Sequence, residues 1–238
     1  IIDFLGGFDF IAGYVRFMVQ ALHITVPVVL HLDHGLSVEH VYQAIDAGYT
    51  SVMFDGSKLP IEENVALTDE VVRYAHRHHV SVEAEVGSVG GNENGLINGI
   101  RYASVTDAVK MAATGIDALA AALGSVHGDY VGRPNLNFER MAAIAAATKL
   151  PLVLHGASGI PDDQIQQAIQ TGTAKININT EVNTVWTAAI TKAVQAKRSG
   201  HDPQPILLAG KKAIAQLVES KMKAFHILGK SKRSVTFE

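Results

Sequence analysis

The chain has 238 residues, 47% of them hydrophobic, and carries a formal net charge of −3 at pH 7. This length and hydrophobic content suffice for one large α/β domain, and the small, dispersed charge argues against a nucleic-acid partner. No apolar run approaches the roughly 18 residues of a membrane span and no signal-peptide pattern opens the chain, so we expect no membrane partner and a cytoplasmic location. The absence of cysteine excludes disulfides and thiolate metal sites, which leaves 11 histidines as the nitrogen ligands available to a metal.

Apolar segments rich in β-branched residues recur along the chain and predict strands. These segments are 26–35, 49–57, 80–88, 117–128, 150–159 and 173–180. Helical patterns separate most of them, at 37–48, 61–79, 104–115, 137–148 and 161–172. Ser37 and Asp162 stand where helix starts need hydrogen-bond acceptors. The alternation of strands and helices indicates parallel βα units within one domain, and the nearly continuous apolar strands indicate a sheet covered on both faces.

Polar side chains gather at the carboxyl end of nearly every predicted strand. They are Asp33, His34, Asp55, Ser57, Glu85, His127, His155, Ser158, Asn177, Asn179 and Thr180. An open doubly wound sheet usually gathers its site at one switch point, whereas a TIM (β/α)8 barrel presents residues from many strand ends. The barrel, as a single domain over residues 1–238, is therefore the predicted fold.

Three histidines follow apolar strands at equivalent points of the repeated pattern: His34, His127 and His155. Three imidazoles with an open fourth position form a good catalytic zinc site. A single histidine at a strand end is more often a hydrogen-bonded loop residue, but the repetition favours the metal. His31 shares strand parity with Asp33 and fits either the core or a position behind the site.

Carboxylates accompany these histidines. Asp33 is equally a candidate proton shuttle and a candidate orienting partner for a ligand histidine. Glu83 and Glu85 share one face of a predicted buried strand; Glu85 is the better candidate for a metal position, and Glu83 for a structural carboxylate. Glu93 lies in the glycine-rich segment 87–95, which we interpret as a mobile loop, and could act as acid or base or remain solvated.

The segments HGASG (155–159) and NINT (177–180) follow the last two predicted strands. TIM barrels often bind phosphate there through backbone N–H groups and hydroxyls. The residues suited to this are Gly156, Ser158, Asn177, Asn179 and Thr180. Ordinary turn chemistry and a helix cap at Thr180 would explain each segment alone, but the paired occurrence favours phosphate.

Six motifs together resemble the class II, zinc-dependent ketose-bisphosphate aldolases, in the short-loop branch that acts on fructose and tagatose bisphosphates. They are HLDHG (31–35), DGSKLPIEENV (55–65), VEAEVGSVGG (82–91), GIDALAAALGSVHG (115–128), LPLVLHGASGIP (150–161) and AKININTE (174–181). The resemblance extends from about residue 5 to about residue 225.

The resemblance implies a role for each matching residue. Asp33 would be the catalytic proton donor, and Glu93 would move a second substrate proton. Zinc would be held by His34, His127 and His155, and Asp55 and Glu85 would hold a second or alternate divalent ion. The implied dihydroxyacetone-phosphate site consists of Gly128, Gly156, Ala157, Ser158, Asn177, Ile178, Asn179 and Thr180. The resemblance also implies a monovalent cation (Na⁺ or K⁺) near the phosphate and a homodimer or homotetramer.

The expected function is reversible cleavage of fructose 1,6-bisphosphate to dihydroxyacetone phosphate and glyceraldehyde 3-phosphate, a glycolytic step. Zinc would act as a Lewis acid on the ketone, and Asp33 would take the proton in cleavage. Asn179 favours fructose over tagatose 1,6-bisphosphate, because tagatose-type enzymes often have a small residue there. The same residues would also suit a zinc-dependent hydrolase on this barrel, or a truncated, non-catalytic paralogue that binds zinc or phosphosugar.

The chain departs from the family pattern in its strand count. The family barrel has eight strands and six are predicted here, so we expect two βα units, roughly 50–60 residues at about 30 per unit, to precede Ile1.

Two side chains also depart from the pattern. Gln204 stands where the family has an arginine that reaches a neighbouring subunit's site and grips the distal phosphate, and Val131 stands where lysine is common. Glutamine cannot supply that bidentate charge, although Lys211 or Lys212 could serve as point charges. The sequence therefore does not determine which chemical group the substrate carries at its distal end.

Overall fold

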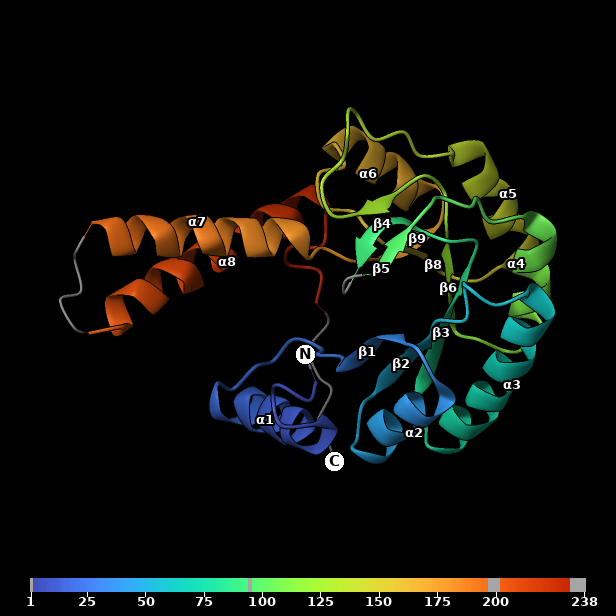
Figure 1. Cartoon of the computed structure of the whole chain (residues 1–238), viewed down its shortest axis with the longest axis horizontal. Helices are drawn as coiled ribbons and strands as arrows, with labels where there is room; N and C mark the ends of the chain where they lie inside the picture. Colours follow the sequence, from blue (N-terminus) through green and yellow to red (C-terminus); the bar gives the residue numbers. More distant parts are fainter. Residues whose placement is uncertain (1, 94–95, 197–201, 232–238) are drawn as a thin grey trace.

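The computed structural model describes residues 2–93, 96–196 and 202–231, and for 92, 93 and 96–98 it describes the backbone alone. Its centre is a six-stranded sheet in the order β1-β2-β3-β6-β8-β9, in which every neighbouring pair is parallel (Figure 1). The strands are β1 (His31–Gly35), β2 (Ser51–Phe54), β3 (Ser81–Val86), β6 (Ala118–Ala121), β8 (Leu152–Leu154) and β9 (Thr173–Ile176). The six predicted strands thus all lie in one sheet, which confirms an α/β fold built on a parallel half-barrel.

Helices between the strands cover the outer face of this sheet (Figure 1). They are α2 (Val38–Asp46), α3 (Ile61–Arg77), α4 (Val105–Ala112), α5 (Phe138–Thr148) and α6 (Asp162–Gln170). The prediction for Ser37 is confirmed, because its hydroxyl accepts the His40 N–H at the start of α2. The prediction for Asp162 is wrong in detail: Pro161 occupies the N-cap, and Asp162 is the first helical residue, where its charge suits the helix dipole.

The core lies between the sheet and these helices. Its largest fully buried side chains come from strands and helices alike, and include Phe54, Met111, Leu119, Met141 and Ile144. Burying a side chain of this size contributes about 1.5–3 kcal/mol. This packing fixes the strands rigidly, so their carboxyl ends hold the polar side chains in defined positions.

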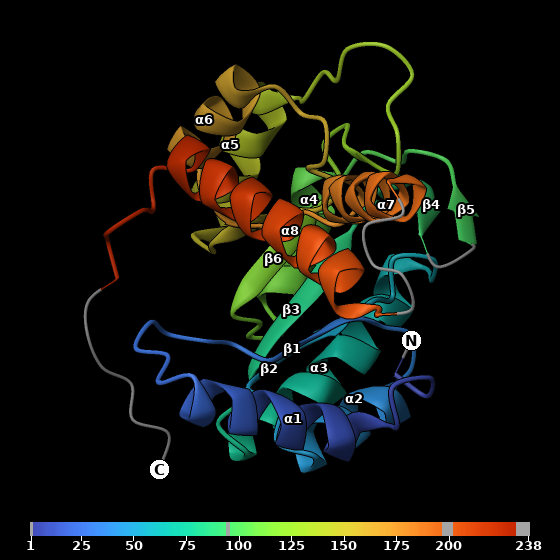
Figure 2. The same ribbon diagram turned by 90° about the vertical axis from the view of Figure 1, so that its left-hand side faces the viewer.

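Three further helices complete the described chain: α1 (Phe8–Ala21), α7 (Thr180–Gln195) and α8 (Gln204–Ala224). α7 and α8 pack on each other as a hairpin that projects away from the sheet (Figures 1 and 2). Gly210 allows the close approach, because a Cβ there would lie 2.6 Å from the Trp186 ring. Among the described residues, no helix combines the length and apolarity that crossing a lipid bilayer requires.

The glycine-rich segment is more regular than we predicted. Its backbone forms a hairpin of β4 (Gly90–Glu93) and β5 (Leu96–Asn98), and β4 also pairs in parallel with β7 (Val126–His127). Gly91 is the register partner of His127. The hairpin therefore supports a candidate metal ligand, and the mobility expected of this segment stays a prediction.

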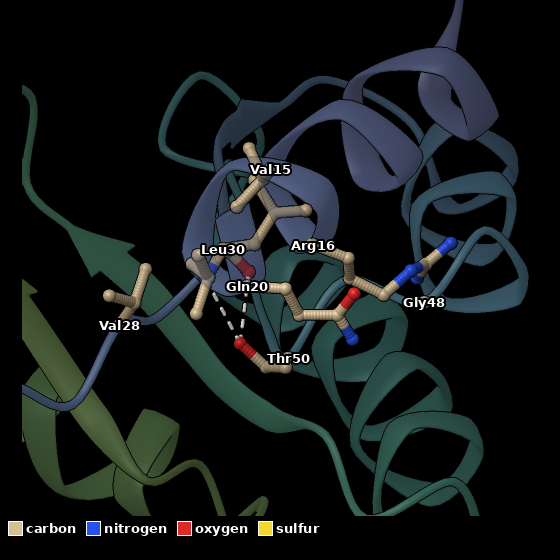
Figure 3. Close-up of a pocket in the computed structure, with 8 residues that line it drawn as sticks. Val15, Arg16, Gln20, Val28, Leu30, Gly48 and Thr50 are labelled. Carbon is tan, nitrogen blue, oxygen red and sulfur yellow. Dashed lines mark hydrogen bonds between the residues drawn. The ribbon is translucent and has the colours of Figure 1, made fainter. Parts of the chain in front are cut away.

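A small cavity of about 80 Å³ lies between α1 and the segments that precede β1 and β2 (Figure 3). The Thr50 hydroxyl accepts the Leu30 N–H at 3.0 Å and lies 3.3 Å from the Leu30 carbonyl oxygen, which joins the residues that precede β1 and β2. This cavity lies at the amino ends of the strands. The predicted site lies at their carboxyl ends, so the cavity is a packing gap beneath α1 and not part of that site.

Candidate active site

A β-bulge places His34 in the mouth of the half-barrel. Along β1, the register partners pass from Leu32–Val52 to Gly35–Phe54, so β1 has one residue more than β2 in this interval. His34 has a φ of 52°, a left-handed conformation that is uncommon for a residue with a side chain. The strict alternation of an unbroken strand is thereby lost, which lets the neighbours Asp33 and His34 both serve one site. Such strain is commonly retained at functional positions.

The three predicted histidines come together across the sheet. The ring centroids lie 5.4 Å apart for His34 and His127, 4.7 Å for His34 and His155, and 5.9 Å for His127 and His155. Each residue offers one ring nitrogen to a group whose ligand atoms all lie within 4.8 Å of one another. Strand ends that are far apart along the chain thus form one cluster with the dimensions of a metal site.

Two carboxylates fix which nitrogen the rings of His34 and His155 turn toward the cluster. Nδ1–H of His34 donates to Oδ2 of Asp55 at 2.7 Å, and Nε2–H of His155 donates to Oε1 of Glu83 at 2.8 Å. The remaining nitrogens, Nε2 of His34 and Nδ1 of His155, lie 2.9 Å apart and carry no hydrogen in neutral rings. Two lone pairs at this distance repel unless a cation lies between them, so the geometry fits a metal ion.

The donor set also fits the identity of that ion. Tetrahedral zinc with Zn–N bonds of about 2.0–2.1 Å separates its ligand nitrogens by about 3.3 Å. The nitrogens of His34 and His155, 2.9 Å apart, are close to this separation. Neutral imidazoles held by carboxylates are the usual zinc ligands, and three of them leave a fourth position for substrate. The group of His34, His127 and His155 could therefore hold a zinc ion.

A second group adjoins the first. His34, Asp55 and Glu85 also present ligand atoms within 4.8 Å of one another, and His34 is common to both groups. Oε1 of Glu85 accepts the Val89 N–H at 3.2 Å, whereas its Oε2 is buried and has no hydrogen-bond partner among the described residues. A buried carboxylate oxygen without a donor is costly, and a second or alternate divalent ion would satisfy it.

The electrostatics of the carboxylates differ sharply. Burial alone would raise the pKa of Asp55, but hydrogen bonds with His34 and Ser57 outweigh it and lower that pKa to about 2. Burial would likewise raise the pKa of Glu83. The hydrogen bond with His155 and the positive charge of Lys175 outweigh it and lower that pKa to about 2. Burial and the Asp55 charge raise the pKa of Glu85 to about 7. Asp55 and Glu83 are thus ionised acceptors for the ligand rings.

Asp33 lies at the rim of the cluster and is exposed to solvent. Its Oδ1 accepts a hydrogen bond of 3.2 Å from the Asn177 side-chain amide, which joins the end of β1 to the segment after β9. Asp55 and Glu83 already orient the histidines, so this position favours the proton-shuttle role for Asp33. The side chain of Glu93 lies outside the described residues, and its role stays a prediction.

All but one of the residues predicted to bind the phosphosugar lie in two adjacent segments, after β8 and β9. The Ala157 N–H donates to the Asn177 carbonyl at 3.3 Å, and the Glu181 N–H at the start of α7 donates to the Ser158 hydroxyl at 3.2 Å. Asn179 occupies the N-cap of α7 and Thr180 its first position, where backbone N–H groups point outward. Ile178 is different, because its side chain packs against the core and leaves only its backbone for a ligand.

Tyr130 joins the loop after β7 to the loop after β8. Its hydroxyl donates to the Gly156 carbonyl at 2.8 Å and accepts the Val126 N–H at 3.0 Å. No pattern in the sequence indicates this role. Gly128, also predicted to contact the phosphosugar, lies in the same loop with a φ of 92°.

Replacing Gly156 with alanine is expected to destabilise the protein by about 1–3 kcal/mol. Gly156 has a φ of +62°, and a Cβ there would lie 2.3 Å from the Val126 carbonyl oxygen, which is rigid backbone. Thermal denaturation measures the effect. Gly13→Ala in α1 is the matched control, because nothing lies within 4 Å of its added Cβ and alanine favours the helix. Equal melting temperatures for the two variants would contradict the close contact.

Three residues of this network were undervalued in the sequence. We predicted a structural role for Glu83, yet it contacts a candidate ligand directly. We assigned no role to Lys175 or Tyr130 from the sequence. Strand parity, which already placed Glu83 on one face with Glu85, could also have found Lys175, because it shares a face with Asn177.

Comparisons with known proteins show which family the chain resembles. The family model described as "Fructose-bisphosphate aldolase class-II" matches residues 1–230. The 6-phospho-5-dehydro-2-deoxy-D-gluconate aldolase of Bacillus subtilis (strain 168) is 55% identical over 232 residues, covering 97% of this chain and 80% of that protein. The fructose-bisphosphate aldolase of Geobacillus stearothermophilus is 47% identical over 230 residues, covering 96% and 80%.

A solved structure agrees as well. The crystal structure of the YdjI aldolase from Escherichia coli K12 superposes with a TM-score of 0.82 at 35% identity, over 94% of this chain and 78% of that chain. The family match over nearly the whole chain, the named relatives and the fold lead to one conclusion. The chain belongs to the class II fructose-bisphosphate aldolase family and is an aldolase, a lyase.

Proposed function

We propose that this aldolase uses zinc to cleave a phosphorylated ketose and releases dihydroxyacetone phosphate. The observation that carries the proposal is the convergence of His34, His127 and His155 beside Asp33 and two loops suited to phosphate. When bound, zinc would supply a Lewis acid that polarises the ketone and its neighbouring hydroxyl. The monovalent cation implied by the resemblance would lie near the phosphate.

The protein's own residues would bind the substrate and move its protons. Backbone N–H groups of the loop after β8 and of the α7 N-terminus would hold the phosphate. Asp33 would take the hydroxyl proton of the carbinol carbon as the bond to the carbon beside the ketone breaks, which forms the aldehyde. The electron pair stays on the dihydroxyacetone phosphate half, and a proton delivered there, a role proposed for Glu93, completes the balance.

We propose 6-phospho-5-dehydro-2-deoxy-D-gluconate as the preferred substrate. Aldol cleavage of this compound would give dihydroxyacetone phosphate and 3-oxopropanoate. Five relatives that carry its name are 52–55% identical to this chain, whereas relatives named fructose-bisphosphate aldolase are 47–48% identical. Its distal end carries a carboxylate and not a second phosphate, so Gln204 in place of arginine costs less binding energy than with a bisphosphate.

Fructose 1,6-bisphosphate is the second candidate, with tagatose 1,6-bisphosphate as its close alternative. Asn179 favours the fructose compound by resemblance, and the dihydroxyacetone-phosphate half is common to all three substrates. In the structure, Gln204 is the first residue of α8 on the projecting hairpin, and its backbone N–H donates to Oδ1 of Asp202 at 2.9 Å. A long side chain from this hairpin could reach a second subunit, as the implied homodimer or homotetramer requires.

The test measures triose-phosphate release from the three substrates in parallel. We expect kcat/KM for the sugar acid to exceed that for either bisphosphate by about tenfold or more, since loss of one charged hydrogen bond costs about 1.5–3 kcal/mol. Equal or higher efficiency with fructose 1,6-bisphosphate would overturn this choice of substrate. Zinc retention without any cleavage would support the non-catalytic paralogue instead.

A Gln204→Arg variant sharpens the same test. The restored guanidinium is expected to raise kcat/KM for fructose 1,6-bisphosphate about tenfold and to change the sugar-acid value less. Gln170→Arg is the control, because Gln170 is exposed at the end of α6, outside the projecting hairpin. If both variants behave alike, Gln204 has no part in choosing the distal group.

A further inference from the structure

Lys175 is a charged residue that the reaction proposed above does not use. It lies in β9, and its side chain is 36% exposed. Nζ donates to Oε2 of Glu83 at 2.7 Å and to Nε2 of His31 at 3.2 Å. Because His31 accepts at Nε2, its Nδ1–H donates to the Ser51 hydroxyl, at 2.8 Å. One ammonium group thus contacts two other strands.

These contacts cross the interior of the half-barrel. β1 and β9 are the two edge strands of the six-stranded sheet, and β3, which carries Glu83, lies between them. Lys175 on β9 therefore joins one edge of the sheet to its centre through Glu83 and to its other edge through His31. The Asn177–Asp33 hydrogen bond makes a second link between the same edges, nearer the mouth.

Glu83 carries this link to the candidate metal site. Its side chain is 3% exposed and that of His155 is 0% exposed. One carboxylate oxygen accepts from the His155 ring and the other from Lys175, so the carboxylate cannot rotate without losing one of the two bonds. The hydrogen bond between His155 and Glu83 sets the orientation of the His155 ring, and the bond from Lys175 holds the Glu83 carboxylate in place.

We propose that Lys175 is a positioning residue for the metal site, which acts through Glu83 to hold the His155 ring with Nδ1 facing His34 and His127. The inference rests on the three-histidine zinc site proposed above. A buried carboxylate that lost its ammonium partner would turn toward other donors or solvent, and the His155 ring would follow it. Zinc affinity, and not substrate binding, is the property that this contact controls.

A merely structural role for Lys175 makes a different prediction. If the lysine stabilised the sheet alone, its loss would lower the melting temperature and leave the zinc dissociation constant of the folded protein unchanged. A positioning role requires that the zinc dissociation constant rise, and that the rise depend on Glu83. A double-mutant cycle separates these two cases.

The experiment compares Lys175→Met, Glu83→Gln and the double variant with the wild type. Zinc affinity is measured by competition with a chromogenic chelator, and the visible spectrum of bound Co²⁺ reports the ligand geometry. We expect each single variant to bind zinc about 10–100-fold more weakly. The double variant should bind no more than about twofold more weakly than Glu83→Gln, since the lysine acts through that carboxylate. The Co²⁺ bands should shift in all three.

Lys110→Met is the matched control, because it also breaks a lysine–glutamate pair. Nζ of Lys110 lies 3.0 Å from Oε1 of Glu62, but both side chains are largely exposed, at 46% and 75%. Its zinc affinity and Co²⁺ spectrum should match the wild type. The proposal is overturned if Lys175→Met binds zinc within threefold of the wild type, or if the double variant loses the product of both single effects.

The role of Lys175 can be tested even if one variant fails to fold. The double variant contains neither the lysine nor the glutamate charge. If Lys175→Met alone fails to fold, the zinc affinity of the double variant relative to Glu83→Gln still tests whether the lysine acts through Glu83. Lys175→Arg, which keeps the charge, should recover at least part of the zinc affinity if the ion pair is the cause. Failure of the proposed function looks different, because the wild-type protein itself would then bind no zinc.

Discussion

An alanine in place of His155 is expected to abolish zinc retention and to lower kcat/KM for aldol cleavage at least about 10³-fold. The ring is fully buried, and its Nδ1 faces the other two candidate ligands. A Lewis acid contributes several kcal/mol of transition-state stabilisation, and each 1.36 kcal/mol is a factor of ten in rate. Zinc content after gel filtration and the rate of triose-phosphate release measure the two effects.

The fold should survive this change well enough for both measurements. Glu83 loses one partner in the variant but keeps the Lys175 ammonium, so its charge remains paired. His76→Ala is the control, since that imidazole is exposed and pairs with Asp117 at 3.0 Å on the surface. A folded His155→Ala protein that keeps one zinc per chain, or more than a tenth of the wild-type kcat/KM, would rule out the three-histidine site.

Asp33→Asn is expected to lower kcat about 10²–10⁴-fold while the protein keeps its zinc. The asparagine has the same shape and can still accept the hydrogen bond from Asn177, but it cannot take the substrate's hydroxyl proton. Asp33 makes no ligand-orienting hydrogen bond among the described contacts, since Asp55 and Glu83 make those bonds. Steady-state kinetics and metal analysis on the same preparation separate rate from binding.

Asp69→Asn is the matched control for this change. Asp69 is half-exposed on α3 and pairs with Arg73 one turn away, so the variant should keep wild-type kcat and zinc content. Loss of zinc in Asp33→Asn, together with the loss of rate, would return Asp33 to the orienting role that the sequence left equally open. Unchanged kcat would exclude both roles.

The fold was largely predictable because it depends on a repeated local signal. Each buried parallel strand is a short apolar run between helical segments, and all six such runs are strands of one sheet. The helix boundaries were also close: α5, for example, is Phe138–Thr148 where we predicted 137–148. The β4–β5 hairpin was missed because glycine-rich strands carry little side-chain pattern, and their pairing depends on β7, which is distant in sequence.

The site was predictable as a set of residues but not as a geometry. Parallel strands bring their carboxyl ends together, so the three histidines could be expected to converge. The β-bulge that directs His34 into the site depends on the pairing register between β1 and β2. The sequence of β1 alone does not determine that register. The Lys175–Glu83 contact joins residues 92 positions apart, and nothing local marks either one as a partner of the other.

The expected two further βα units stay a prediction. The chain spans 80% of the Bacillus subtilis relative and 78% of the Escherichia coli aldolase chain whose structure it matches. In the described residues, β1 and β9 form the two edges of the six-stranded sheet. Two hydrogen bonds join these edges, one between Lys175 and His31 and one between Asn177 and Asp33. Two more strands between those edges would complete an eight-stranded barrel.

The most direct test of the zinc site is a crystal structure of the zinc-loaded protein with anomalous diffraction recorded on both sides of the zinc absorption edge. We predict one strong anomalous peak about 2.0–2.1 Å from Nε2 of His34 and Nδ1 of His155, with His127 as the third ligand. A peak bound through the opposite nitrogen of either ring, a peak elsewhere on the chain, or none at all would contradict the account.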